Sequence, residues 1–117
     1  MQVYRKGTGV EYTPFNHFDM TTQVLFNPDC GSEKANVTLS TLKKGSGSFA
    51  EVHPESDQIF YMVKGEMCIR SEGELQYVLA EGDAILIKAG DVHSVINEAE
   101  GDCSFVSITV PPLKSTH

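Results

Sequence analysis

Hydrophobic and β-branched residues occur in short runs along this chain, and within each run they alternate with polar residues. A period of two is typical of strands that bury one face. No stretch shows the spacing of three to four residues that marks an amphipathic helix. The pattern therefore predicts nine strands, at residues 18–26, 35–42, 49–53, 58–64, 67–71, 75–79, 84–87, 93–97 and 103–110.

Glycine-rich turns separate most of these runs. We expect each of them to place a Gly where the backbone needs a positive φ, at residues 43–47, 64–66, 72–74, 81–83, 89–91 and 100–102. Many short strands joined by such turns are typical of a sandwich or a barrel. We therefore predict an all-β fold.

The two ends of the chain carry weaker patterns. Residues before Asn27 alternate poorly and have no partner close in sequence, so we expect them to pair with a distant strand of this chain or with another subunit. Pro111 and Pro112 end the last strand, and we expect residues 113–117 to be frayed.

Composition limits the size and the partners of the protein. The chain has 117 residues, 40% of them hydrophobic, and no linker-like segment, which predicts a single domain over residues 1–117. A formal net charge of −7, without a basic stripe, disfavours binding to nucleic acid. No apolar run could span a bilayer or act as a signal peptide, so we expect a cytoplasmic protein without a membrane partner.

The three cysteines, Cys30, Cys68 and Cys103, are far apart and form no CxxC pair. Their number and spacing argue against a disulfide framework and against a thiolate zinc site. We expect them to be reduced and to act as small buried hydrophobic residues.

Two of the four histidines lie where strands can bring them together. His53 is two residues from Glu51, a separation that puts both side chains on one face of a strand. Gln58 opens the next predicted strand, and His93 follows a glycine turn. Two imidazoles, one carboxylate and one amide oxygen suit Zn, Fe, Mn, Ni or Co. We therefore predict a divalent metal site made of Glu51, His53, Gln58 and His93.

Two sequence patterns resemble the two motifs of the cupin superfamily. The first cupin motif, G-x5-H-x-H-x3,4-E-x6-G, resembles Gly45-x5-Glu51-x-His53-x4-Gln58-x6-Gly65, at residues 45–65. The second, G-x5-P-x-G-x2-H-x3-N, resembles Gly82-x5-Lys88-x-Gly90-x2-His93-x3-Asn97, at residues 82–97. Every spacing is kept. The resemblance implies a cupin domain, a jelly-roll-like double-stranded β-barrel, in which Asn97 braces a turn and the four predicted ligands meet inside the barrel.

Three positions depart from the cupin pattern. Glu51 replaces a His and Gln58 replaces a Glu, so the pair of changes keeps one carboxylate in the ligand set, and Lys88 replaces a Pro. We interpret the pair as compensation that preserves a working metal site. The alternative is a barrel that has lost its metal, in which Glu51 and Gln58 bind each other and water. Burying a carboxylate without a cation is costly, which favours the metal site.

A second register of the first motif would begin at Gly47. It would make His53 the first ligand and Glu55 the second. We prefer the register that begins at Gly45, because only that one leaves Gln58 six residues before Gly65.

The motifs indicate the fold more specifically than the function, because the cupin barrel hosts many activities. Our leading hypothesis is a metal-dependent isomerase or lyase that acts on a sugar or on a keto or enol acid, with the metal as Lewis acid and Glu51 as catalytic base. The donor composition resembles that of the mannose-6-phosphate isomerases. The alternatives are a non-haem iron dioxygenase, with Glu51, His53 and His93 as its ligands, and a non-catalytic cupin that senses a small ligand.

Further expectations concern the pocket and the assembly. The side chains with the parity of the ligands should face the barrel interior and form either an apolar substrate-binding pocket or plain core packing: Phe49, Phe60, Met62 and Val95. We expect His17 at the surface or in an interface. Small cupins commonly dimerise by exchanging N-terminal strands, so the resemblance implies a homodimer.

Overall fold

The computed structural model describes residues 1–113, apart from the side chain of Glu74. The end of the segment predicted to fray, including His117, lies outside the described residues. Two short 3-10 helices, Pro28–Cys30 and Glu72–Glu74, interrupt a chain made of strands. The strands are β1 (Glu11–Tyr12), β2 (His17–Phe26), β3 (Asn36–Ser48), β4 (Asp57–Lys64), β5 (Met67–Ser71), β6 (Gln76–Leu79), β7 (Ala84–Ile87), β8 (His93–Ile96) and β9 (Cys103–Val110).

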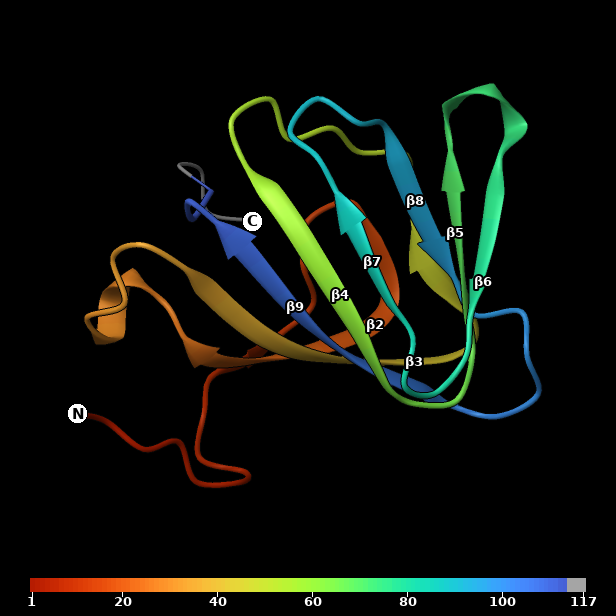
Figure 1. Ribbon diagram of the computed structural model, residues 1–117. Coiled ribbons are helices and arrows are strands. Elements are labelled where there is room, and N and C mark those ends of the chain that lie inside the picture. Colours follow the sequence, from red (N-terminus) through yellow and green to blue (C-terminus); the bar gives the residue numbers. More distant parts are fainter. Residues whose placement is uncertain (114–117) are drawn as a thin grey trace.

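The strands form one sheet that curls into a nearly closed barrel (Figure 1). The order across the sheet is β6-β5-β8-β3-β9-β4-β7, and β2 pairs with β3 and with β1. The prediction of an all-β barrel is confirmed. The segment before Asn27 pairs within its own chain, because β2 lies antiparallel to β3 along nearly its whole length.

Strand β3 differs from its prediction. The sequence predicted two strands and a turn at residues 43–47, whereas the structure has one strand of 13 residues. Gly45 adopts a φ of 82°, which glycine tolerates readily, and beyond it β3 changes partner from β9 to β8. The chain leaves the sheet after Ser48, so Glu51 and His53 lie in a loop instead of on a strand.

The barrel interior has an apolar half and a polar half. Inward-facing residues at one end, such as Leu42, Met62 and Phe105, belong to the hydrophobic core. Further along the same three strands, the inward positions carry Thr38 on β3, Gln58 on β4 and Thr109 on β9, all of them buried. The polar half is the part of the fold that can hold a site.

No helix within residues 1–113 is long and apolar enough to cross a membrane. All three cysteines are free thiols, as the sequence predicted. Cys68 and Cys103 are buried, but Cys30 is exposed, so the prediction of burial was wrong for that residue. The reason is local, since Cys30 ends a 3-10 helix on the surface and its backbone N–H is capped by the side chain of Asn27.

Candidate functional site

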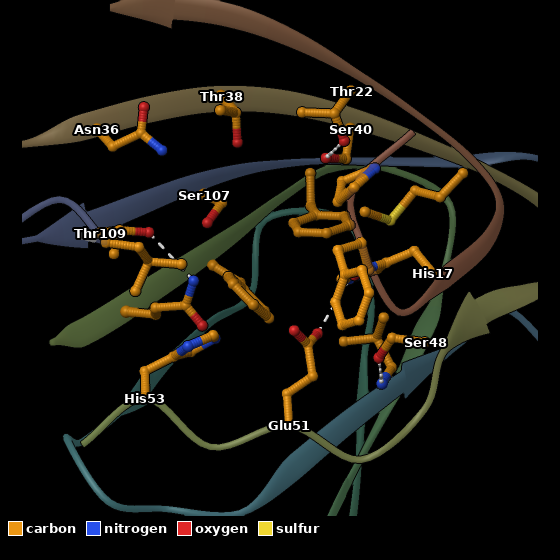
Figure 2. A pocket seen from close by; sticks show the side chains of 18 of the residues that line it. His17, Thr22, Asn36, Thr38, Ser40, Ser48, Glu51, His53, Ser107 and Thr109 are labelled. Atoms are coloured by element: carbon orange, nitrogen blue, oxygen red, sulfur yellow. Dashed lines mark hydrogen bonds and ion pairs between the residues drawn. The ribbon is translucent and has the colours of Figure 1, made fainter. Parts of the chain in front are cut away.

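A cavity of about 100 Å³ opens into the polar half of the barrel. The four predicted metal ligands all line it, and so do Phe60 and Val95 of the predicted substrate pocket. In Figure 2, the side chains of Glu51 and His53 enter the cavity on the side opposite a row of Ser and Thr side chains. The structure therefore gathers residues from β4, β8 and the loop after β3 around one space.

The loop that carries Glu51 is tied to the start of β8. The backbone N–H of Glu51 donates to the carbonyl of His93 over 2.7 Å, and the N–H of His93 donates back to the carbonyl of Glu51 over 2.9 Å. The carbonyl of His53 accepts a hydrogen bond from Gly90. These bonds hold the loop with Glu51 and His53, within the first motif, beside Gly90 and His93 of the second motif, although this loop is not a strand.

His93 is prepared to offer a nitrogen lone pair to the cavity. Its Nδ1 lies 3.1 Å from the carbonyl of Asp91, which can only accept, so Nδ1 carries the proton and Nε2 is left as the acceptor. Burial lowers the pKa of His93, although the hydrogen bond and the charge of Asp91 oppose this shift. A neutral imidazole held by its second nitrogen is the usual state of a metal ligand.

Gln58 contributes an oxygen with no protein partner. Its Nε2 donates to Oγ1 of Thr109 over 3.1 Å, and this bond fixes the orientation of the amide. The Oε1 atom is buried and accepts no hydrogen bond from any residue within 1–113. A buried acceptor without a donor is costly, so this oxygen is suited to bind something that enters the cavity.

Glu51 has a partner that the sequence did not predict. Its Oε1 lies 3.2 Å from Nε2 of His17, and both side chains are mostly buried, at 16% and 13% exposure. Nδ1 of His17 lies 2.7 Å from the carbonyl of Phe15, which orients the ring. Burial raises the pKa of Glu51 to about 7, so near neutral pH its carboxyl group exchanges a proton readily.

Three expectations about the site residues were wrong. His17 lies in the cavity wall instead of on the surface, because β2 pairs with the end of β3 and sets His17 opposite Ser48. Phe49 is 63% exposed and packs on the ring of Phe18, since the chain has left the strand on which its parity was counted. Met62 faces the barrel interior as predicted, but it belongs to the hydrophobic core, which was the alternative, and it does not line the cavity.

The preferred motif register agrees with the geometry. Glu55, a ligand in the alternative register, is exposed and does not line the cavity, whereas Glu51 does. Asn97 is fully buried, and its side chain bonds the backbone of Leu42, Ala99 and Gly101. The expectation that Asn97 braces a turn is confirmed.

The candidate ligands fit a metal ion in their chemistry. Two imidazoles with ring centroids 5.4 Å apart, a carboxyl group and an unpartnered amide oxygen form a donor set suited to a divalent transition metal. Within residues 1–113, however, no three His, Cys, Asp or Glu side chains lie close enough together to share an ion. In this arrangement the carboxyl group of Glu51 contacts His17.

A second feature of the cavity was also missed. Six of its lining residues are buried Ser or Thr side chains: Ser48, near Glu51, and five on the opposite side, Thr22, Thr38, Ser40, Ser107 and Thr109. The signal was present in the sequence, because Thr38 and Ser40, like Ser107 and Thr109, are separated by two residues within a predicted strand. Polar residues at alternate positions of a half-buried strand ordinarily lie on its outer face, but here they face inward.

Comparisons with known proteins place this architecture. A family model described as "Cupin domain" matches residues 38–109. A search of curated protein sequences gave no match.

Three of the similar solved structures share the whole fold at low sequence identity. The polyketide cyclase RemF from Streptomyces resistomycificus has a TM-score of 0.86 at 14% identity, covering 100% of this chain and 84% of that one. A predicted oxalate decarboxylase from Thermotoga maritima has a TM-score of 0.81 at 18% identity, covering 95% and 100%. KdgF from Halomonas sp. has a TM-score of 0.80 at 16% identity, covering 95% of each chain. Since the family model spans more than half of the sequence, and the barrel carries both motifs around one cavity, the chain belongs to the cupin family.

Proposed function

We propose that this chain is a small metal-dependent enzyme that acts, as an isomerase or lyase, on a small hydroxylated or keto/enol substrate. His53, Gln58, His93 and Glu51 would hold one divalent ion, and the ion would supply Lewis-acid chemistry to a substrate oxygen. The observation that carries the proposal is the buried Oε1 of Gln58, which has no partner among the described residues and lines the same cavity as both imidazoles.

The residues of the chain have separate tasks in this proposal. Glu51 is the acid–base group when its carboxyl group leaves the metal and contacts His17, because in that state burial raises its pKa to about 7 and it can take up and return a proton near neutral pH. His17 orients the carboxyl group of Glu51 and accepts or donates the shared proton through Nε2. Phe60 and Val95, both buried, form the apolar wall that limits water near the reacting atoms.

A metal-free ligand-binding module is the second candidate. It is favoured by the contact between Glu51 and His17, which gives the buried carboxyl group a partner in the absence of a cation. The partner differs from the one predicted for a barrel without metal, in which Glu51 would bind Gln58.

Elemental analysis separates the two candidates. Protein purified from medium supplemented with Zn, Mn, Fe, Co and Ni is expected to carry close to one transition-metal ion per chain. Occupancy below about a tenth would reject the metal enzyme and leave the binding module. To separate isomerase or lyase chemistry from dioxygenase chemistry, the Fe(II) protein is mixed with catechol under air, and we expect no uptake of oxygen.

We also propose a homodimer formed through the outer face of the barrel. Outward-facing residues of adjacent strands pair in register there, with Leu86 beside Ile59 and Tyr61 beside Val106. Ile59, Tyr61 and Leu86 are 40%, 48% and 57% exposed. Exposed apolar side chains that lie side by side in this way are typical of an interface. Because none of these residues is charged, the same surface of an identical copy can pack against it.

Two lysines introduced on this face are expected to dissociate the dimer. The double variant Tyr61→Lys/Leu86→Lys places like charges in the interface, and it should sediment as a monomer at micromolar concentration, whereas the unchanged protein sediments as a dimer. Ser94→Lys, on the outward side of β8, is the control and should leave the dimer intact. A monomeric unchanged protein in the same ultracentrifugation experiment would contradict the proposal.

A further inference from the structure

One wall of the cavity consists of small hydroxyl side chains. Figure 2 shows Thr38, Ser40 and Thr22 above the cavity and Ser107 and Thr109 beside it, facing Glu51 and His53. All five are between 2% and 8% exposed. Barrel interiors are ordinarily filled by branched apolar side chains, so five buried hydroxyl groups at one end need an explanation.

The register of three strands builds this wall. Thr22 on β2 lies opposite Ser40 on β3, and Thr38 on β3 lies opposite Ser107 on β9. Thr109 follows Ser107 by two residues and therefore shares its face. The hydroxyl groups thus form cross-strand pairs that all point into the same space.

The hydrogen bonds within the wall are incomplete. Thr22 and Ser40 bond each other over 2.8 Å, and Thr109 accepts from Gln58. Thr38 and Ser107 are 6% and 8% exposed and line the same cavity. Oε1 of Gln58 is buried and unpartnered among the residues within 1–113. Hydroxyl groups that both donate and accept are therefore directed at the cavity contents.

The cavity lining also lacks a fixed cation. Within residues 1–113, none of the side chains that line it belongs to Lys or Arg. Phosphate groups in proteins are usually bound by Arg, Lys or helix N-termini, and only β-strands and loops surround this space. A phosphate group that entered the cavity would therefore have to bind the proposed metal ion, whereas hydroxyl groups can bond the Ser and Thr side chains directly.

We infer that the wall of Ser and Thr side chains binds an uncharged polyhydroxylated molecule, a neutral sugar or sugar alcohol, whose hydroxyl groups bond Thr38 and Ser107. This inference rests on the proposed function, because it names the substrate class of the same cavity. A volume of about 100 Å³ is well below the ~300–1,000 Å³ of sites for drug-sized ligands. The cavity therefore receives one end of such a molecule.

Binding to a defined panel tests the inference. Erythritol, xylitol, xylose and glucose are compared with erythronate, xylonate and glucose 6-phosphate by saturation-transfer NMR and titration, on the full chain with and without added Zn²⁺. We expect at least one neutral compound to bind. Thr38→Val and Ser107→Ala should each weaken that binding roughly three- to tenfold, the usual loss for one neutral hydrogen bond.

Matched controls lie on the same strands. Thr41→Val and Ser104→Ala make the same changes on β3 and β9, at a pair of half-buried outward-facing residues, and should leave binding unchanged. Binding of no neutral compound, tighter binding of a charged one, or equal effects of inward and outward variants would overturn the inference. Zn²⁺ bound without any sugar would reject this inference alone, whereas sugar bound by protein that takes up no metal would reject the metal enzyme alone.

Discussion

Replacing His93 with Ala is expected to lower the affinity of the protein for Co²⁺ by roughly 100-fold or more. His93 is buried and neutral, and its Nδ1 is held by the carbonyl of Asp91, so its Nε2 binds a metal without first losing a proton or reorienting. Removal of this ring leaves His53 as the one remaining imidazole of the proposed ligand set. Titration with Co²⁺, followed by the visible absorption bands of the bound ion, measures the loss directly.

The control for this variant is Ser94→Ala on the same strand, where the side chain is outside the cavity lining. It should keep the affinity and the absorption spectrum of the unchanged protein. Thermal unfolding of both variants checks that the barrel is intact. An intact His93→Ala barrel that binds Co²⁺ as tightly as the unchanged protein would show that His93 is no ligand, and the proposed metal site would be wrong.

The alternation of apolar and polar residues predicted the barrel well, because each strand buries one face and the side-chain period is fixed by the backbone. It placed every strand from β4 to β9 within one residue of its observed bounds. The failure lies at β3, where glycine-rich sequence looked like a turn. The same residues stay in the sheet, since Gly45 takes the positive φ and Gly47 lets β8 approach.

The two cupin-like motifs predicted which four donors would line one cavity. They could not predict His17, because that residue belongs to no motif and reaches Glu51 only through the pairing of β2 with β3. They also misplaced Phe49, whose parity holds only if the strand continues past Ser48. Contacts that depend on the register between strands far from the motifs cannot be predicted from a single sequence.

Gly47 is the position where a single methyl group is expected to cost the most stability. A Cβ atom built there would lie 2.1 Å from the carbonyl oxygen of Val95 and 3.0 Å from Cα of Ile96. Both are backbone atoms of β8, so no side-chain rotation can relieve the overlap. We expect Gly47→Ala to lower the free energy of unfolding by about 3 kcal/mol or more and the melting temperature by roughly 10 °C or more.

Gly45→Ala separates this steric effect from backbone strain. Gly45 has a φ of 82°, but a Cβ there meets no described atom within 4 Å, so its cost should be limited to about 1–2 kcal/mol for the left-handed conformation. Thermal and urea unfolding should therefore give a much lower stability for Gly47→Ala than for Gly45→Ala. Equal stabilities would mean that β8 can move away from β3. The backbone of His93 in β8 is hydrogen-bonded to the loop that carries Glu51, so this loop would move together with β8. The metal affinity of the Gly47→Ala barrel would then fall only slightly.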